Sequence, residues 1–319
     1  MMRDLKTHTT LMTILLMAAL TGCVSVSKNN HTGADLFAPI KAGPYEVVEQ
    51  APDSDWRPVE ADNMLVMTLS LAGEERTVVF ELLPDLAPGH IANTKALVKQ
   101  GIFDNTQFYR VIDGFVAQGG PMYEEGSALP DLTEGQLTIP AEFTSALDLG
   151  DHYLAFDSED GFADETGFYK GFAVGRDWSE QSSWLLHCYG VLAAGRANDP
   201  DTGGTELYIV NGPAQRYLDR NTTVFGRVID GMAAIQALKR TQGLSGAVAL
   251  EDSENVIKQI VVGSQLPPGQ RPQLEVMRTD SISFKRLLAA RKNRNEDWFL
   301  YQHDYIDACG VSIPVRLVE

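Results

Sequence analysis

The chain has 319 residues, with 26 Lys and Arg against 43 Asp and Glu, which gives a formal net charge of −17 at pH 7. Apolar residues make up 44% and charged residues 22% of the sequence, an ordinary globular composition that excludes a fully disordered or collagen-like chain. The acidic balance argues against a protein that binds nucleic acid by neutralising phosphates with Lys and Arg, and three cysteines are too few for a disulfide scaffold.

The N-terminus has the pattern of a secretion signal. Two cations precede an almost entirely apolar run over residues 11–20. Such a run is too short to cross a bilayer, which needs about 20 apolar residues, but it suits the apolar region of a signal peptide. It ends in the sequence LTGC, which resembles the bacterial lipobox. We therefore expect residues 1–22 to be a lipoprotein signal peptide and Cys23 to be lipidated, with an ordinary signal peptide as the alternative.

Lipidation at Cys23 would place the chain in a bacterial cell envelope. Acyl chains contribute about 0.8 kcal/mol per buried CH₂, so several chains on one residue anchor a protein firmly to a membrane. Val24 follows the cysteine, whereas Asp at that position resembles an inner-membrane retention signal. We therefore expect a protein that faces the periplasm, on the outer rather than the inner membrane. The polar residues 23–58, with scattered Pro and Gly and little periodicity, predict a tether that holds the domain off the membrane.

The two other cysteines are Cys188 and Cys309. Because the expected compartment is oxidising, we expect a disulfide between them that joins the C-terminal tail to the main domain. Two separate buried thiols are the alternative.

Strand signals begin after the tether. Apolar runs over residues 64–71 and 76–83 flank a turn that contains glycine and predict a β-hairpin. Helical spacing follows between Pro88, which suits a first turn, and Gly101, which suits a C-terminal cap. A second helix is predicted over residues 231–240. Further short strands are predicted at 107–112, 115–118, 191–194, 207–210, 224–229 and 256–262. Many short strands with two helices indicate a mainly β fold, an antiparallel barrel or sandwich.

Two long segments interrupt or follow this pattern. Residues 144–190 are far more than a hairpin connection needs and are rich in Gly, acidic and aromatic residues. They predict either a flap that recognises partners or a packed excursion with a small core of its own. Prolines after Leu266 mark a boundary, and residues 283–292 predict a helix that docks on the barrel or binds a partner. We therefore expect a main domain over 59–266 and a C-terminal extension over 267–319.

The sequence predicts no metal site. The acidic run over residues 157–161 lacks the spacing of a calcium-binding loop. His152, His187 and His303 lack the spacing of metal ligands, and we interpret them as structural.

Residues 103–120 read FDNTQFYRVIDGFVAQGG. This segment resembles the signature of cyclophilin-type peptidyl-prolyl cis-trans isomerases, in which Phe is followed by His-Arg-Val-Ile, a two-residue turn, Phe, two residues and Gln-Gly-Gly. Residues 84–106, 201–210 and 217–232 resemble other segments of this family, in the same order. The resemblance covers about residues 60–265 and is interrupted by the insertion.

The resemblance implies a cyclophilin-like eight-stranded antiparallel barrel capped by two helices, with the substrate groove on its outer face. It implies rotation about an X-Pro peptide bond, whose amide resonance gives a barrier of about 18–20 kcal/mol. Such a reaction requires no nucleophile, metal or cofactor. It requires a donor near the proline amide, an apolar slot for the ring and polar groups that hold the flanking backbone.

The resemblance assigns the central roles to four positions. Arg110 would be the catalytic donor, because its permanently charged, rigid guanidinium suits polarisation of the prolyl nitrogen or the neighbouring carbonyl; a surface salt bridge is the alternative. Phe115 and Val116 would line the proline slot, with barrel core as their alternative. Because strand neighbours point to opposite faces, we favour Phe115 for the slot. Gln118 would hold the substrate backbone, and a turn-stabilising amide is its alternative.

Further positions match the family's substrate wall, and several depart from its pattern. The wall residues are Gly195, Glu206, Tyr208, Tyr217, Leu218 and Thr222. Glu206 stands for a Gln and adds negative charge near Arg110. Tyr217 stands for a Trp, and Thr222 stands for a His or Tyr and shrinks one wall. Tyr109 replaces a His whose side chain points away from the groove, so we expect it to change little. At Gly195, where the family commonly has Ala, a bulge glycine is the alternative.

We therefore expect a prolyl isomerase that acts on proline-containing segments of exported proteins. It would be a monomer, held to the membrane by the lipid on Cys23, without a cofactor and without nucleic acid as a partner. The departures at Glu206, Tyr217 and Thr222 leave a second interpretation open, a catalytically weak cyclophilin-like module that binds such segments as a chaperone or scaffold. A third is a structural envelope lipoprotein whose interface is the insertion and the C-terminal helix.

Overall fold

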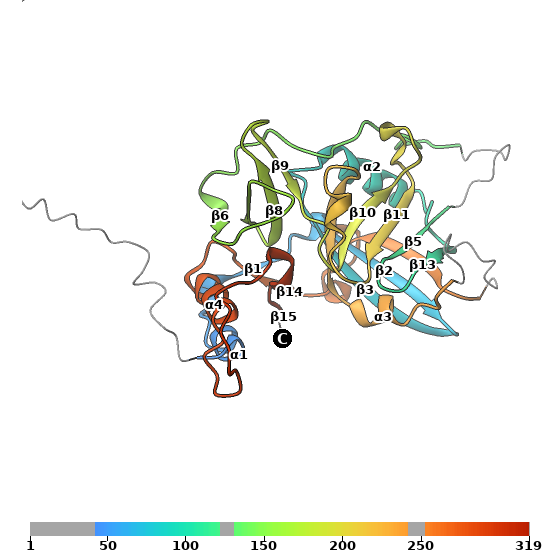
Figure 1. The fold of residues 1–319 in the computed structure, drawn as a ribbon. Coiled ribbons are helices and arrows are strands. Elements are labelled where there is room, and N and C mark those ends of the chain that lie inside the picture. Colours follow the sequence, from blue (N-terminus) through green and yellow to red (C-terminus); the bar gives the residue numbers. More distant parts are fainter. Residues whose placement is uncertain (1–41, 122–130, 242–252, 319) are drawn as a thin grey trace, which may run out of the picture. The chain divides into compact units, whose positions relative to one another are not determined.

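The apolar runs of the sequence form a closed antiparallel barrel (Figure 1). The computed structural model describes residues 42–121, 131–241 and 253–318, all within a unit that spans Leu36–Glu319. The predicted signal peptide and the lipidation site at Cys23 lie outside the described residues. Among the helices that the structure describes, none combines the length and the apolar character of a membrane span.

Each strand of the barrel pairs antiparallel with its neighbours, in the order β10-β11-β5-β4-β13-β2-β3-β12, and β12 closes on β10. The strands are β2 (Met64–Leu71), β3 (Glu74–Leu82), β4 (Thr106–Val111), β5 (Val116–Gly120), β10 (Val191–Gly195), β11 (Glu206–Val210), β12 (Val224–Asp230) and β13 (Val256–Val262). The turn between β2 and β3 has positive φ at both Ala72 and Gly73, which suits the twist of a tight hairpin. The predicted hairpin and the predicted eight-stranded barrel are confirmed.

Two helices, α2 (Pro88–Lys99) and α3 (Met232–Gln236), cover the core of the barrel. Side chains at alternate positions of each strand point inward. The helices add apolar side chains to the same cluster, which includes Leu65, Met67, Leu69, Phe80, Ile91, Leu97, Phe108, Phe225 and Ile235. The two predicted helices are confirmed, although α3 ends at Gln236 rather than at Arg240. Beyond this end, the Arg240 guanidinium donates to the carbonyls of Gln236 and Leu238 and satisfies them.

The insertion folds into a four-stranded antiparallel sheet whose strands pair in chain order, and we call it the insertion sheet. Its strands are β6 (Tyr153–Phe156), β7 (Glu165–Tyr169), β8 (Phe172–Asp177) and β9 (Ser182–Leu185). Lys170 and Gly171 both have positive φ and form the tight turn between β7 and β8. The insertion is thus ordered by strand pairing, which the short apolar runs of the sequence did not reveal.

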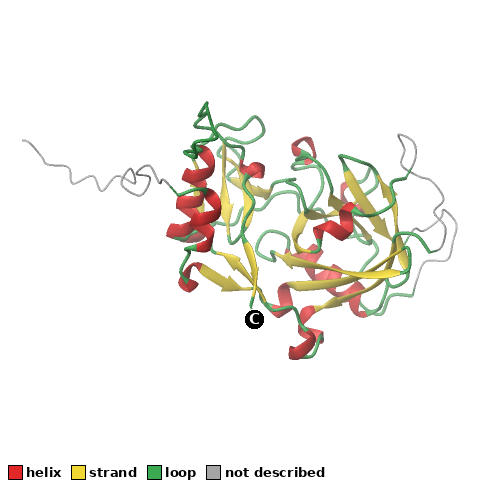
Figure 2. Cartoon of the chain, turned by 90° about the horizontal axis from the view of Figure 1, so that it is seen from below, coloured by secondary structure: helices red, strands yellow, loops and turns green. Residues whose placement is uncertain are grey.

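A second hydrophobic core, which we call the accessory core, joins three segments that are far apart in the sequence. α1 (Pro44–Glu49) packs against α4 (Ile282–Lys292), and the two helices lie side by side in Figures 1 and 2. β14 (Leu274–Met277) pairs with both β1 (Trp56–Pro58) and β15 (Val315–Leu317). The buried side chains of the accessory core include Val47, Trp56, Phe156, Phe168, Trp184, Met277, Phe284 and Leu287.

Two expectations are corrected by the accessory core. The predicted tether over 23–58 is wrong for residues 44–58, which fold because Val47 and Trp56 bury apolar surface there. The C-terminal helix does not dock on the barrel, since its fully buried Phe284 packs edge-to-face on Phe168 of the insertion sheet. Phe156, Phe168 and Trp184 of the insertion therefore share a core with both ends of the described chain.

A disulfide ties the C-terminal segment to the insertion. The sulfur atoms of Cys188 and Cys309 lie 2.02 Å apart and form the pair that the sequence leads us to expect. Both cysteines lie against the accessory core, so the bond crosslinks packed rather than open structure. Short 3-10 helices connect the larger elements: η2 (Asp53–Asp55), η3 (Ala61–Asn63), η4 (Gly150–His152), η5 (Pro200–Thr202), η6 (Arg216–Leu218), η7 (Gly263–Gln265), η8 (Pro268–Gln270) and η9 (Ala308–Gly310).

Candidate functional site

A β-bulge places Tyr109 and Arg110 next to each other on the outside of the barrel. The pairing of β4 with β5 shifts between Gln107 and Arg110, so that β4 carries one residue more than its partner over this stretch. Phe108 and Val111, on either side of the pair, both join the barrel core. The two residues between them therefore face outward together.

Arg110 is fixed by two predicted site residues. Its guanidinium carbon lies 5.4 Å from the centroid of the Phe115 ring, within the range of a cation–π contact. One of its N–H groups donates to Oε1 of Gln118 at 3.1 Å. The side chain is half-buried, so its permanent charge stands at the outer surface with limited freedom. The structure thus brings Arg110, Phe115 and Gln118 together.

Gln118 links Arg110 to two further side chains. Its Nε2 donates to the Tyr109 hydroxyl at 2.8 Å, and that hydroxyl donates to Oε2 of Glu206 at 2.5 Å. Because each group donates to the next, the four side chains form one chain of hydrogen bonds that orients the Gln118 amide. The Tyr109 hydroxyl touches two predicted site residues, so its side chain lies toward the site and does not point away from it.

Glu206 is the acidic end of this chain. Burial raises the pKa of Glu206 from 4.5 to about 7, and the hydrogen bond from Tyr109 opposes only part of that rise. Burial and the nearby Glu206 carboxylate raise the pKa of Tyr109 well above its ordinary value. The phenol therefore stays protonated and keeps its role as donor. Tyr109 holds the Glu206 carboxyl, whose negative charge is only partly present at pH 7 because its pKa is about 7.

Two glycines leave room for these side chains. A Cβ at Gly119 would lie 2.7 Å from the carbonyl oxygen of Gln107, so strand β5 can approach the bulge only without a side chain there. A Cβ at Gly195 would lie 2.9 Å from the Cβ of Glu206 and 3.2 Å from Nε2 of Gln118. Gly195 pairs opposite Glu206 in regular register. Its effect is to leave space for the Gln118 amide, and it does not form a bulge.

The apolar part of the site lies on the outer face of β5 and β11. Val116 and Tyr208 are 2% and 5% exposed and share an apolar cluster with residues of the insertion sheet such as Phe172. Phe115 is half-buried against the same cluster, because it precedes β5 and the strand alternation does not yet apply to it. The preference for Phe115 over Val116 as the slot residue stays a prediction, with which the burial of Val116 is consistent. Both lie on the site side of the barrel, and Phe115 is the more accessible of the two.

The remaining wall residues lie in or after η6. Tyr217 is 60% exposed, whereas Leu218 is half-buried. The Thr222 hydroxyl is hydrogen-bonded to the hydroxyl of Tyr208 and lies 3.0 Å from Nε2 of His187. The short Thr222 side chain thus lies against His187, a histidine of the insertion.

Tyr109 and His187 are site residues that the sequence did not reveal. The glycine pair Gly119-Gly120 could have indicated the position of Tyr109. Glycine within a strand often marks a β-bulge or a close approach of two backbones, and a bulge in the neighbouring strand changes which residues face outward. His187 carries no such signal, since its position depends on how the insertion packs.

This arrangement suits stabilisation of a twisted amide. Arg110 offers fixed N–H donors, and the ring of Phe115 offers an apolar surface directly beneath the charge. Gln118 adds polar groups for an extended backbone, held in place through Tyr109. Donors that are already oriented act on a transition state without covalent chemistry.

Comparison with known proteins agrees with this geometry. Residues 66–263 match the family model described as cyclophilin type peptidyl-prolyl cis-trans isomerase/CLD. The chain is 28% identical over 205 residues to a probable peptidyl-prolyl cis-trans isomerase of Brucella suis, a match that covers 60% of this chain and 86% of the relative. It is 30% identical over 155 residues to peptidyl-prolyl cis-trans isomerase B of Bacillus subtilis, covering 49% of this chain and 78% of the relative.

The likeness to a solved structure extends beyond the barrel. The structure of cyclophilin AquaCyp293 from Hirschia baltica matches with a TM-score of 0.66 and 27% identity, over 88% of this chain and 100% of that one. Since the family model covers only residues 66–263, this broader match includes parts of the chain outside it. The family model and these relatives indicate the same family as the eight-stranded barrel with an arginine on its outer β-bulge. The chain belongs to the cyclophilin-type peptidyl-prolyl cis-trans isomerases (EC 5.2.1.8).

Proposed function

We propose that this isomerase acts on X-Pro bonds of exported proteins and that Arg110 is its catalytic residue. The observation that supports this role is the position of a permanently charged guanidinium 5.4 Å from the Phe115 ring on the outer face of the barrel. A proline ring resting on Phe115 would bring its amide nitrogen next to the donors of Arg110.

The physical basis is the electronic change along the rotation. In the planar amide the nitrogen lone pair is delocalised, and in the twisted state the C–N bond is nearly single and the lone pair is localised on nitrogen. An N–H donor of Arg110 directed at that lone pair stabilises the twisted state more than the planar one, which is the condition for acceleration. Gln118 would hold the flanking backbone while the bond rotates.

The expected location rests on the sequence and on one structural observation. A signal peptide over residues 1–22 and lipidation at Cys23 would deliver the chain to the periplasmic face of a membrane. The Cys188–Cys309 disulfide supports an oxidising compartment. In cells fed a radioactive fatty acid, wild-type chain should carry label that is absent from Cys23→Ser, and label retained by the variant would exclude lipidation there.

The activity is tested with a protease-coupled assay on a chromogenic X-Pro peptide. Wild-type chain should accelerate isomerisation, and Arg110→Ala should lower kcat/KM by about 10²–10³-fold, as loss of one preorganised donor does. Arg110→Lys should fall in between, because it keeps the charge but not the rigid fork. Arg76→Ala is the matched control, since Arg76 lies exposed on β3 and pairs with Glu74 there.

The result separates two functions. No acceleration by folded wild-type chain would reject the enzyme, and equal rates for wild type and Arg110→Ala would reject the role of Arg110. A binding module of low activity is the second candidate, favoured by the burial of Val116 and Tyr208 beneath the insertion sheet. It predicts that wild-type chain binds a proline peptide without accelerating its isomerisation.

A further inference from the structure

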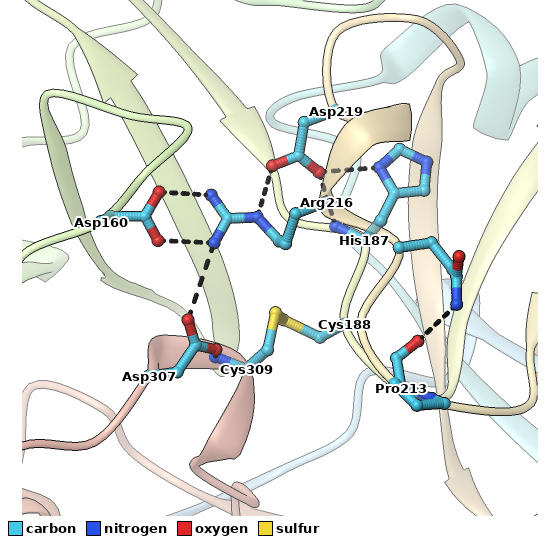
Figure 3. The surroundings of a disulfide bond; sticks show 9 residues. Asp160, His187, Cys188, Pro213, Arg216, Asp219, Asp307 and Cys309 are labelled. Atoms are coloured by element: carbon cyan, nitrogen blue, oxygen red, sulfur yellow. Dashed lines mark hydrogen bonds and ion pairs between the residues drawn. A yellow bond between two sulfur atoms is a disulfide. The ribbon is translucent and has the colours of Figure 1, made fainter. Parts of the chain in front are cut away.

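The insertion delivers a fully buried histidine to the back of the site. His187 lies between β9 and β10 and has no exposed surface. Its backbone N–H donates to Oδ1 of Asp219 at 2.9 Å, and its carbonyl accepts from the N–H of Gln215 at 2.8 Å. The end of the insertion is thus held on both sides by the segment that carries η6, as Figure 3 shows for His187 and Asp219.

The imidazole joins this segment to two hydroxyls of the site. Nδ1 lies 2.9 Å from Oδ1 of Asp219, and Nε2 lies 2.9 Å from the Tyr208 hydroxyl and 3.0 Å from that of Thr222. The two hydroxyls are also hydrogen-bonded to each other. The rings of His187 and Tyr208 are nearly parallel, at an interplanar angle of 15°. The imidazole and the two hydroxyls are therefore each within hydrogen-bond distance of the other two.

Asp219 fixes the orientation of the imidazole. Burial raises the pKa of Asp219, but hydrogen bonds from His187 and Arg216 outweigh it and hold that pKa below its usual value. The carboxylate is therefore ionised and can only accept, which places the proton on Nδ1 of His187. Nε2 is then the ring nitrogen that hydrogen-bonds with the hydroxyls of Tyr208 and Thr222.

The insertion holds Asp219 from the other side. Arg216 donates from Nε to Oδ2 of Asp219 at 2.6 Å and from its two terminal nitrogens to Asp160 at 2.6 and 2.9 Å (Figure 3). The side chains of Arg216, Asp160 and Asp219 are only 4–6% exposed. Asp160 lies in the insertion between β6 and β7, and Cys188 follows His187 directly, so the disulfide fastens the same stretch. The polar chain runs unbroken from the insertion to Tyr208.

We propose that His187 is a positioning residue for substrate binding, and that it acts by fixing the hydroxyls of Tyr208 and Thr222 in the wall of the site. The proposal rests on the proposed function, since it takes the outer face of β11 as the wall that a bound peptide meets. The insertion would then have a defined task, to supply the group that holds the wall in place of a larger side chain at position 222.

The consequence is a separation of binding from turnover. A wall that contacts the peptide equally before and during rotation contributes to KM, whereas the donor that acts on the twisted amide contributes to kcat. His187 contacts Asp219, Tyr208 and Thr222, whereas the Arg110 guanidinium is held by Gln118 and Phe115. His187→Ala should therefore raise KM about tenfold, the loss expected for one buried hydrogen-bond partner, and change kcat less than about twofold.

A double-mutant cycle tests whether His187 acts through the hydroxyls. KM and kcat are measured by exchange NMR, and the Kd of the same proline peptide by NMR titration, for wild type, His187→Ala, Tyr208→Phe with Thr222→Val, and all three changes together. We expect the effect of His187→Ala on KM and Kd to vanish when both hydroxyls are absent. An equal rise in both backgrounds, or no rise in either, would overturn the proposal.

Controls separate folding, positioning and the function itself. His152→Ala removes an exposed histidine of the same insertion and should leave KM unchanged. If His187→Ala does not fold, two milder variants still test the proposal. Tyr208→Phe removes only a hydroxyl, and Thr222→Val replaces one with a methyl group of similar size. An unchanged KM and Kd in both variants would refute the proposal. If wild-type chain binds the peptide without accelerating its isomerisation, the proposed enzymatic function is refuted. The double-mutant cycle measured in Kd still tests the role of His187.

Discussion

At the scale of single residues, the chemistry of the site depends on which side chains hold Arg110 and Gln118 in place. The resemblance to the family identified Arg110, Phe115 and Gln118, because these types stand at fixed spacing in one segment. It did not indicate the contacts of Tyr109, because a bulge changes the face on which a residue lies and the alternation of apolar residues in the sequence does not reveal a bulge.

Tyr109→Phe removes the hydroxyl between Gln118 and Glu206 and keeps the ring. We expect kcat/KM to fall about tenfold, because the Gln118 amide loses the acceptor that orients it and a buried carboxylate loses its donor. The same assay on Tyr45→Phe, which removes an exposed hydroxyl on α1, should give the wild-type value. An unchanged kcat/KM in Tyr109→Phe would show that the chain of hydrogen bonds does not support the site.

Glu206 makes stability depend on pH in a direction opposite to that of most carboxylates. Its pKa is about 7 in the folded chain against an ordinary 4.5, so the folded state holds this proton more tightly than the unfolded state. The contribution of Glu206 to stability is therefore complete below pH 4.5 and is lost as the pH rises through 7.

Glu206→Gln removes this dependence. The free energy of unfolding of the variant, relative to that of wild type, should rise by about 2 kcal/mol between pH 5 and pH 8.5. Urea unfolding of both chains at several pH values measures this difference, and other titrating groups cancel in it. A difference that stays constant across the range would show that Glu206 titrates near its ordinary value.

At the scale of elements, the barrel and the helix α4 were predictable, whereas the insertion strands and the fold of residues 44–58 were not. The strands β2, β3 and β13 and the helix α2 follow directly from apolar periodicity and from Pro and Gly at their ends. The insertion strands are short, and their aromatic side chains are buried by α4 and by other segments distant in sequence. Local patterns do not contain such partners, so the insertion and residues 44–58 appeared as irregular chain.

The disulfide also acts between elements, because it joins η9 to the connection between β9 and β10. Cys188 and Cys309 are 121 residues apart in the sequence. A disulfide restricts the unfolded chain, and removal of a native disulfide commonly destabilises a protein. Its removal should therefore lower the free energy of unfolding by about 2–5 kcal/mol. Cys188→Ser with Cys309→Ser, compared with wild type by urea unfolding with and without reductant, measures the loss. Equal stability of oxidised wild type and the double variant would contradict this expectation.

At the scale of the whole molecule, the insertion contributes to two apolar clusters, the accessory core and the cluster on the outer face of β5 and β11. The barrel core is built by the family segment, whereas the accessory core takes α1, the insertion sheet and α4 from three distant regions. Through the disulfide at Cys188 and the hydrogen bonds of His187, the accessory core is connected to the Tyr208 hydroxyl.

A chain that ends at Leu266 tests this interdependence. The deletion removes β14, α4, β15 and the disulfide, and it exposes Phe168 and Trp184. We expect the melting temperature to fall by about 10 °C or more and an apolar dye to bind, because several kcal/mol of packing is lost. A truncated chain with the wild-type melting temperature would show that the extension is dispensable for the fold.

The most direct test of the central claim is two-dimensional exchange NMR on a proline peptide with catalytic amounts of this chain, which needs no helper protease. We expect wild-type chain to raise the cis–trans exchange rate far above that of the unaided reaction, which takes about 10–100 s. Arg110→Ala at equal concentration should lose about a hundredfold or more of that gain. Exchange that folded wild-type chain does not accelerate, or that both chains accelerate equally, would contradict the central claim.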